Sequence, residues 1–149
     1  MPPISMRLEA RKEEHLNPSA VHILLLIGRI LYGAFFLISG VNHFVKMNSY
    51  KQYAGMKNVP AASVAVVVSG LLILLGGLSV LLGFWPYIGL LLIAIFLVCV
   101  TPKMHAFWSV SDPMARMGEQ VNFMKNVALL GAALAMAAIP QPWPMSLGR

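Results

Sequence analysis

The chain has 149 residues, of which 58% are hydrophobic and only 11% are charged, and its mean hydropathy is +0.75. Soluble domains carry about 25% charged residues, so this composition excludes an ordinary soluble globule. The 11 basic residues exceed the 5 acidic ones and give a net charge of +6. They are scattered among tails, loops and helix ends, as in chains whose membrane spans are flanked by Lys and Arg. We therefore expect no nucleic-acid partner.

Four long apolar runs divide the chain into predicted membrane-spanning helices. A helix needs about 20 apolar residues to cross a hydrocarbon core of about 30 Å. Because lipid offers the backbone no hydrogen-bond partner, such uninterrupted runs must be helical. The sequence therefore predicts an all-α protein, a membrane four-helix bundle within the lipid bilayer that occupies residues 20–139. The expected spans are about 20–44, 61–84, 87–108 and 117–139.

Polar tails flank the predicted bundle. Residues 1–19 mix basic and acidic side chains, which predicts a solvated or interfacial segment and not a cleaved signal. Residues 140–149 contain three prolines, which end the last helix because proline cannot continue the backbone hydrogen-bond pattern. Trp143 in this tail is expected to lie at the membrane interface.

The first span, AVHILLLIGRILYGAFFLISGVNHF, carries a stripe of residues separated by alternating steps of four and three. This spacing places their side chains on one face of a helix. The glycines of the stripe allow another helix to approach closely. Its arginine must face the bundle, find an acceptor or reach the nearer interface, because an isolated charge in lipid is costly. The stripe comprises Arg29, Gly33, Phe36, Gly40 and His43.

The second span carries no ionisable side chain, but glycines recur in it at seven-residue intervals. Small residues on one face are typical of helix packing in membranes, so we assign this span a packing role and no catalytic residue. The packing glycines are Gly70, Gly76, Gly77 and Gly83.

Cys99 is the chain's one cysteine. Membrane bundles that exchange disulfides with a quinone need paired thiols, so one chain cannot carry out that chemistry. The apolar neighbours of Cys99 indicate a small core residue.

Polar residues recur where the first span ends, where the third ends and where the fourth begins. Since consecutive spans run antiparallel, these three points lie at one membrane face. Pro102 is expected to kink the third span there and to free a carbonyl group. Unpartnered polar groups inside a membrane are costly, so we predict that they converge, together with Glu119, on a polar pocket. The candidate pocket residues are Arg29, Asn42, His43, His105, Trp108, Asn122, Lys125 and Asn126.

Other interpretations of these side chains remain open. Lys125 would extend to the headgroups, His43 would be interfacial, Trp108 would belong to an aromatic belt, and the asparagines would hold helices together. Haem ligation by His43 and His105 is disfavoured because both residues lie near the membrane edge. Metal binding is also disfavoured, because the sequence contains no cluster of carboxylates that could serve as ligands. Hydrolytic chemistry lacks a triad or paired carboxylates. No residue is assigned a catalytic or metal-binding role.

Three stretches resemble the DoxX family of small membrane proteins: LLIGRILYGAFFLISGVNHF, SGLLILLGGLSVLLGF and MHAFWSVSDPMARMGEQVNFMKNVALLG. The resemblance covers roughly residues 23–134, and the last stretch is the most specific. It implies a four-helix protein of the bacterial cytoplasmic membrane. The family takes its name from a subunit associated with quinone-linked thiosulfate oxidation, and some members are linked with redox-stress complexes. The family-like positions are Arg29, Gly40, His43, Gly76, Gly77, His105, Phe107, Trp108, Lys125 and Asn126.

One position departs from the family pattern. Many members have a glutamate before Leu-Leu-Gly-Gly in the second span, where this chain has Ile73. The departure leaves Arg29 without an evident acidic partner inside the bundle. It lowers the expectation of proton-coupled quinone chemistry in this chain.

Three hypotheses of function follow. In the first, the chain is an accessory subunit of a quinone-linked or redox-stress membrane system, whose pocket binds a quinone or docks a membrane or peripheral redox protein. Lys125, His105 or Asn126 would donate to the quinone, and a partner would supply the second redox centre. The second is a structural or assembly protein without a cofactor, and the third is a homo-oligomeric carrier of small solutes or lipids. All three favour an accessory or non-catalytic protein over a stand-alone enzyme.

Overall fold

The structure is a computed structural model that describes Pro3 and residues 17–148. Within these residues the chain is helical and contains no strand, which confirms the predicted all-α class. The N-terminal tail is predicted over residues 1–19. Of these, residues 1–2 and 4–16 lie outside the described residues. The elements are α2 (Pro18–Val45), α3 (Met47–Met56), α4 (Ala62–Leu82), α5 (Pro86–Met104), the 3-10 helix η1 (Phe107–Ser109) and α6 (Pro113–Ala137).

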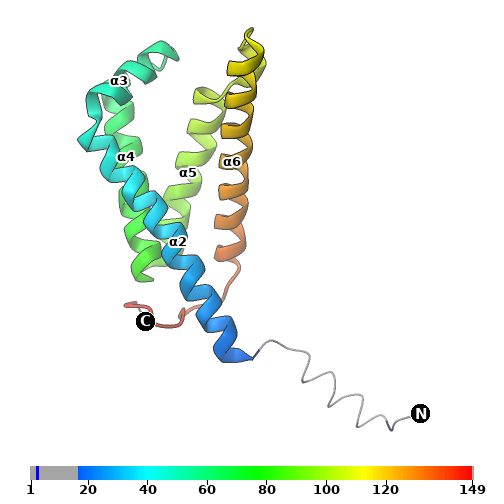
Figure 1. Ribbon diagram of the computed structural model, residues 1–149. Coiled ribbons are helices and arrows are strands. Elements are labelled where there is room, and N and C mark those ends of the chain that lie inside the picture. The colour runs from blue at the N-terminus through cyan, green and yellow to red at the C-terminus, as the bar shows by residue number, and fades with distance from the viewer. Residues whose placement is uncertain (1–2, 4–16, 149) are drawn as a thin grey trace.

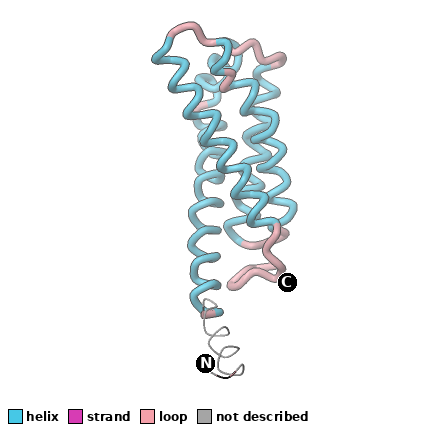
Figure 2. Tube along the Cα trace, turned by 90° about the vertical axis from the view of Figure 1, so that its right-hand side faces the viewer, coloured by secondary structure: helices cyan, strands magenta, loops and turns pink. Residues whose placement is uncertain are grey.

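The four long helices α2, α4, α5 and α6 form an elongated bundle, and the short helix α3 lies at one end of it (Figures 1 and 2). The C-terminal segment lies at the opposite end, near the start of α2 (Figure 1). We call these the α3 end and the C-terminal end. Helix α2 packs on α4, α4 on α5, and α5 on α6. The long helices therefore pack on one another in the order α2, α4, α5 and α6.

Three segments of the described chain are long and apolar enough to cross a membrane: α2, α4 and Pro86–Ser109. Helix α6 has 25 residues, which is long enough at about 1.5 Å per residue. Its first half, however, carries Arg116, Glu119 and Lys125. Since this half lies at the α3 end (Figure 1), the charges of the last helix are gathered at one end of the bundle.

Prolines and capping side chains set several helix boundaries. Pro18, Pro86 and Pro113 each occupy a first helical turn, where the missing N–H group costs nothing and the fixed φ angle favours the helix. Asp112 caps α6 by accepting a hydrogen bond from the Ala115 N–H group at 2.7 Å. Pro102 lies inside α5, which continues only to Met104. The helix thus ends before residue 108, the predicted end of the span.

Glycines allow α2 and α4 to approach each other at backbone distance. A Cβ atom added to Gly77 would lie 2.5 Å from the backbone nitrogen of Leu37 and 2.8 Å from the carbonyl oxygen of Gly33. A Cβ atom at Gly40 would lie 2.7 Å from the Cα atom of Leu74. All five residues of the predicted α2 stripe are buried. The stripe is therefore the face of α2 that α4 covers.

Two other glycines of α4 have different surroundings. Gly76 faces α5, where an added Cβ atom would lie 2.9 Å from the carbonyl oxygen of Gly89. Gly83 lies just beyond the end of α4 and has a φ angle of 66°, a left-handed conformation that glycine adopts without strain. Gly83 thus ends the helix, a role that the seven-residue pattern does not indicate.

The C-terminal segment folds back across the end of the bundle. The Leu147 N–H group donates to the Leu82 carbonyl oxygen at 3.0 Å. Trp143 is only 2% exposed, and its indole Nε1–H donates to the Ile139 carbonyl oxygen at 3.3 Å. Trp143, expected at the membrane interface, is thus enclosed by the protein, because the fold-back places its ring in the core.

Candidate functional site

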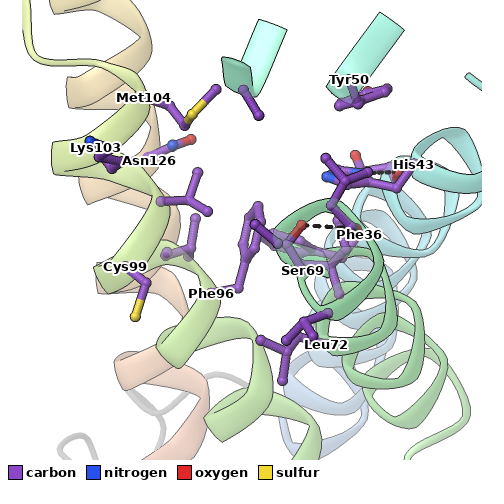
Figure 3. Close-up of a pocket in the computed structure, with 18 of the residues that line it drawn as sticks. Phe36, His43, Tyr50, Ser69, Leu72, Phe96, Cys99, Lys103, Met104 and Asn126 are labelled. Atoms are coloured by element: carbon purple, nitrogen blue, oxygen red, sulfur yellow. Dashed lines mark hydrogen bonds between the residues drawn. The ribbon is translucent and has the colours of Figure 1, made fainter. Parts of the chain in front are cut away.

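A cavity of about 630 Å³ lies between the α2–α4 pair and the α5–α6 pair, towards the α3 end (Figure 3). Core residues such as Phe36 and Ile73, each 1% exposed, form part of its wall. Phe35, Val68 and Ile95 also line it, yet each is more than two-fifths exposed on the outside of the bundle. The cavity is thus largely apolar and opens sideways onto the surface that lipid would cover.

Four of the predicted pocket residues line this cavity. They are His43 from α2, His105 from the end of α5, and Lys125 and Asn126 from α6. The antiparallel order of the helices brings them to the same end of the bundle. Instead of the predicted polar pocket, however, the structure has a mainly apolar cavity with these polar groups in its wall and at its rim.

Arg29, also predicted in the pocket, lies at the C-terminal end instead. Its guanidinium donates from Nη1 to the Pro144 carbonyl oxygen at 3.2 Å and from Nη2 to the Met145 carbonyl oxygen at 2.9 Å. The side chain is buried, with 3% exposed. Arg29 faces the bundle because the folded-back segment supplies acceptors, so it stabilises the C-terminal end and takes no part in the cavity.

In the structure, the replacement of the family glutamate by Ile73 does not affect the surroundings of Arg29. An added Cβ atom at Gly83 would lie 2.6 Å from Nη1 of Arg29, so Gly83 marks the level of the guanidinium on α4. Position 73 is ten residues earlier on the same helix, about 15 Å away at 1.5 Å per residue. An acidic side chain at position 73 would therefore not reach Arg29.

Lys125 is exposed, and its Nζ donates to the Asn122 side-chain oxygen at 3.1 Å. The prediction that Lys125 is enclosed in the bundle is therefore wrong. The reason is that α6 packs mainly on α5 and η1, which leaves the Lys125 side of the helix open. Lys125 consequently lies at the rim of the cavity, whereas Asn122 does not line it.

The other predicted pocket residues do not line the cavity. Asn42 is partly buried on α2 outside it. Trp108 is 55% exposed and packs edge-on against Phe107 and Phe123, with ring centroids 5.2 and 5.7 Å away. Trp108 thus belongs to an aromatic cluster on η1 and α6.

Cys99 is exposed on α5 and also lines the cavity. The expectation of a small core residue at this position is wrong. The reason is that the side of α5 that carries Cys99 borders the cavity and not the packed core.

His43 is the most deeply buried polar group of the cavity wall, with 9% of its surface exposed. Its Nδ1 lies 2.8 Å from the Ser39 carbonyl oxygen, one turn earlier on α2. The imidazole stacks on the Tyr50 ring, with centroids 4.3 Å apart and an interplanar angle of 27°. The end of α2 and the start of α3 therefore fix the ring at the cavity.

Glu119 joins three separate parts of the chain at the α3 end. Its Oε1 accepts a hydrogen bond from Lys57 Nζ, which makes an ion pair, and lies 3.5 Å from the Tyr53 hydroxyl. Its Oε2 lies 2.8 Å from His105 Nδ1. We call Tyr53, Lys57, His105 and Glu119 the Glu119 cluster. Since Tyr53 and His105 also line the cavity, the cluster bridges α3 to α5 and α6 across one side of it.

The ion pair of this cluster favours the charged form of Lys57. Burial by itself lowers the pKa of Lys57, but the hydrogen bond to Glu119 and the charges of Tyr53 and Glu119 outweigh it and raise the pKa above its ordinary value. Lys57 therefore stays protonated near neutral pH. In Tyr53 the largest effect is burial, which raises the pKa of the phenol.

Residues of α3 are the part of the site that the sequence did not reveal. Tyr50, Tyr53 and Ala54 line the cavity, although they lie between the first two predicted spans, where no site residue is expected from the sequence. The available signal was their spacing of three and four residues, which places them on one face of a helix.

Breaking the Glu119 cluster is expected to loosen α3. In Lys57→Gln, the ion pair to Glu119 is lost, and because both side chains are partly buried we expect a loss of about 1 kcal/mol. Amide hydrogen exchange in residues 47–57 should then be about fivefold faster, as measured by mass spectrometry. Lys51→Gln is the matched control on the same helix and should leave exchange unchanged. Equal exchange rates in both variants would contradict the bridging role.

Comparisons with known proteins give two matches. The family model described as DoxX matches residues 24–106, which run from α2 to the end of α5 and include His43 and His105. The chain is also 27% identical over 127 residues to the inner membrane protein YphA of Escherichia coli (strain K12), a match that covers 85% of this chain and 89% of that protein. No solved structure matches significantly.

Proposed function

Because the chain belongs to the DoxX family and is a multi-pass protein of the bacterial inner membrane, we propose that it binds a lipid-soluble quinone as an accessory subunit of a redox-linked membrane system. The observation that carries this proposal is the cavity of about 630 Å³ with mainly apolar walls and a few polar groups. Ligand sites in proteins have this size and this mixture of surfaces.

The geometry suits a ligand that arrives from the bilayer. Three of the exposed side chains that line the cavity, those of Phe35, Val68 and Ile95, are apolar and border openings on its sides. A hydrophobic tail would remain in these openings while the ring enters the cavity. Asn126 and Lys125 carry N–H donors at the cavity, and donors of this kind bind the carbonyl oxygens of a quinone.

An accessory role is consistent with the placement of the charged groups. In this proposal α6 crosses the membrane as the fourth span, with its charged first half at the α3 end. The Glu119 cluster then lies beside the aqueous boundary, where a membrane or peripheral redox protein would dock. Electron transfer would run between the bound quinone and a redox centre of that partner.

Filling the cavity provides the test. Ser69 lines the cavity and donates to the Val66 carbonyl oxygen at 3.1 Å, so the ring of Ser69→Phe would enter the space that a ligand needs. Ser63→Phe makes the same change at an exposed position of α4. After purification in mild detergent and extraction with organic solvent, wild type and Ser63→Phe should carry near-stoichiometric quinone, and Ser69→Phe should carry at least about tenfold less.

Two results would contradict the proposal. If wild-type protein carries no quinone and binds neither added decylubiquinone nor added decylubiquinol, the structural or assembly hypothesis is preferred. If Ser69→Phe keeps as much quinone as Ser63→Phe, the ligand lies elsewhere on the protein.

A further inference from the structure

The hydrogen bond of His43 determines which of its ring nitrogens carries the proton. Nδ1 lies 2.8 Å from the Ser39 carbonyl oxygen. A carbonyl oxygen only accepts, so Nδ1 must carry the hydrogen. In a neutral imidazole the other nitrogen, Nε2, then has a free lone pair and acts as an acceptor.

The surroundings of His43 favour this neutral ring. None of the described residues that line the cavity is acidic, while Lys103 and Lys125 contribute positive charge to its wall. A charged imidazolium would therefore lack a counter-ion, and burying an unpaired charge is costly. His43 thus presents a hydrogen-bond acceptor, not a donor.

Packing holds that acceptor in a fixed direction. The imidazole stacks on Tyr50 and contacts Phe96 edge-on, with centroids 6.3 Å apart and an interplanar angle of 79°. On the side of α4, an added Cβ atom at Gly70 would lie 2.9 Å from the His43 Cβ atom, so the helix leaves the side chain little room to move. Figure 3 shows the His43 ring on one wall of the cavity, with Asn126 and Lys103 on the opposite wall.

From this arrangement, and on the basis of the proposed function, we infer that the cavity selects the reduced, hydroquinone form of its ligand. One hydroxyl of the hydroquinone donates to Nε2 of His43, and the second oxygen accepts from the Asn126 amide on the opposite wall. An oxidised quinone would place a carbonyl oxygen, itself an acceptor, against Nε2. That contact leaves two acceptors facing each other without a hydrogen, which weakens binding. His43 is therefore the residue that determines the specificity for the redox state of the ligand.

The test compares three ligands that differ in hydrogen-bond donors. Decylubiquinol has two hydroxyl donors, whereas decylubiquinone and the dimethyl ether of decylubiquinol have none. Binding to the full-length protein in mild detergent is measured by isothermal titration calorimetry under argon. We expect wild type to bind decylubiquinol at least about tenfold more tightly than either of the other two.

Variants of His43 test whether its Nε2 acceptor causes the preference for decylubiquinol. His43→Phe keeps an aromatic ring against Tyr50 but removes Nε2, and it should bind decylubiquinol and decylubiquinone with affinities within about twofold of each other. His43→Gln supplies a side-chain oxygen as an acceptor and should restore part of the preference. His22→Phe is the matched control at an exposed position of α2 and should behave as wild type.

The possible results separate this inference from the proposed function. If wild type binds decylubiquinone as tightly as decylubiquinol, or if His43→Phe keeps the preference, the inference is overturned while quinone binding stands. If wild type binds none of the three ligands, the proposed function fails and the inference fails with it.

Discussion

Gly77→Ala is expected to lower the free energy of unfolding by about 3 kcal/mol, at the upper end of the range for an overpacked core. The added Cβ atom would lie within 3 Å of three backbone atoms of α2, which belong to Leu37, Gly33 and Phe36. A backbone cannot escape by changing a side-chain rotamer, so α2 and α4 must move apart along their whole interface. The loss is measured by titrating sodium dodecyl sulfate into mild-detergent micelles and following the near-ultraviolet circular dichroism.

Gly131→Ala is the matched control. Gly131 lies in α6, and an added Cβ atom there meets nothing within 4 Å, so the variant should gain up to about 1 kcal/mol from the higher helix propensity of alanine. Gly33→Ala should resemble Gly77→Ala, and the double variant should cost less than the sum because both changes separate the same pair of helices. Wild-type stability of Gly77→Ala would contradict the close crossing of α2 and α4.

Features that depend on a single stretch of chain could be predicted from the sequence. Uninterrupted apolar runs must be helical in lipid, and the steps of three and four from Arg29 to His43 define one face of α2 whatever lies against it. That face is the buried one. The alternation of span direction was also sufficient to bring His43, His105 and Asn126 to one end of the bundle.

Features that depend on how the helices rotate and pack against one another could not be predicted from the sequence. Lys57 and Glu119 are 62 positions apart, and no pattern in either segment indicates that they pair. The rotation of α6 decides whether Lys125 is enclosed or lies at the rim, and this rotation follows from packing on α5 and η1. The apolar character of the cavity likewise comes from side chains of all four long helices, none of which is unusual in its own span.

The acceptors of Arg29 are the clearest case of this limit. They are backbone carbonyl oxygens 115 and 116 positions away in the sequence. Every residue has a carbonyl group, so an acceptor of this kind has no signature in the amino-acid sequence. The groups that stabilise the buried guanidinium therefore could not be predicted from the sequence, in which an acidic side chain is the recognisable partner of an arginine.

Arg29→Met is expected to lower the free energy of unfolding by about 3 kcal/mol, because hydrogen bonds from a charged group contribute about 1.5–3 kcal/mol each and the apolar side chain recovers part of the loss. The C-terminal segment should also come away from the bundle, which carboxypeptidase Y digestion followed by mass spectrometry would detect as faster removal of residues 144–149. Arg116→Met changes an exposed arginine of α6 and should stay within about 0.5 kcal/mol of wild type.

Truncation after Trp143 tests whether the guanidinium and the C-terminal segment act as a unit. In wild type the truncation removes both acceptors and leaves a buried charge unpaired, which costs about 3–5 kcal/mol. In the Arg29→Met background there is no buried charge to leave unpaired. The same truncation should therefore lower the free energy of unfolding by at least about 1 kcal/mol less than in wild type. If the truncation costs the same in both backgrounds, Arg29 and the folded-back segment are not coupled. If it costs less in the methionine background, the segment stabilises the C-terminal end mainly by supplying acceptors for one buried arginine.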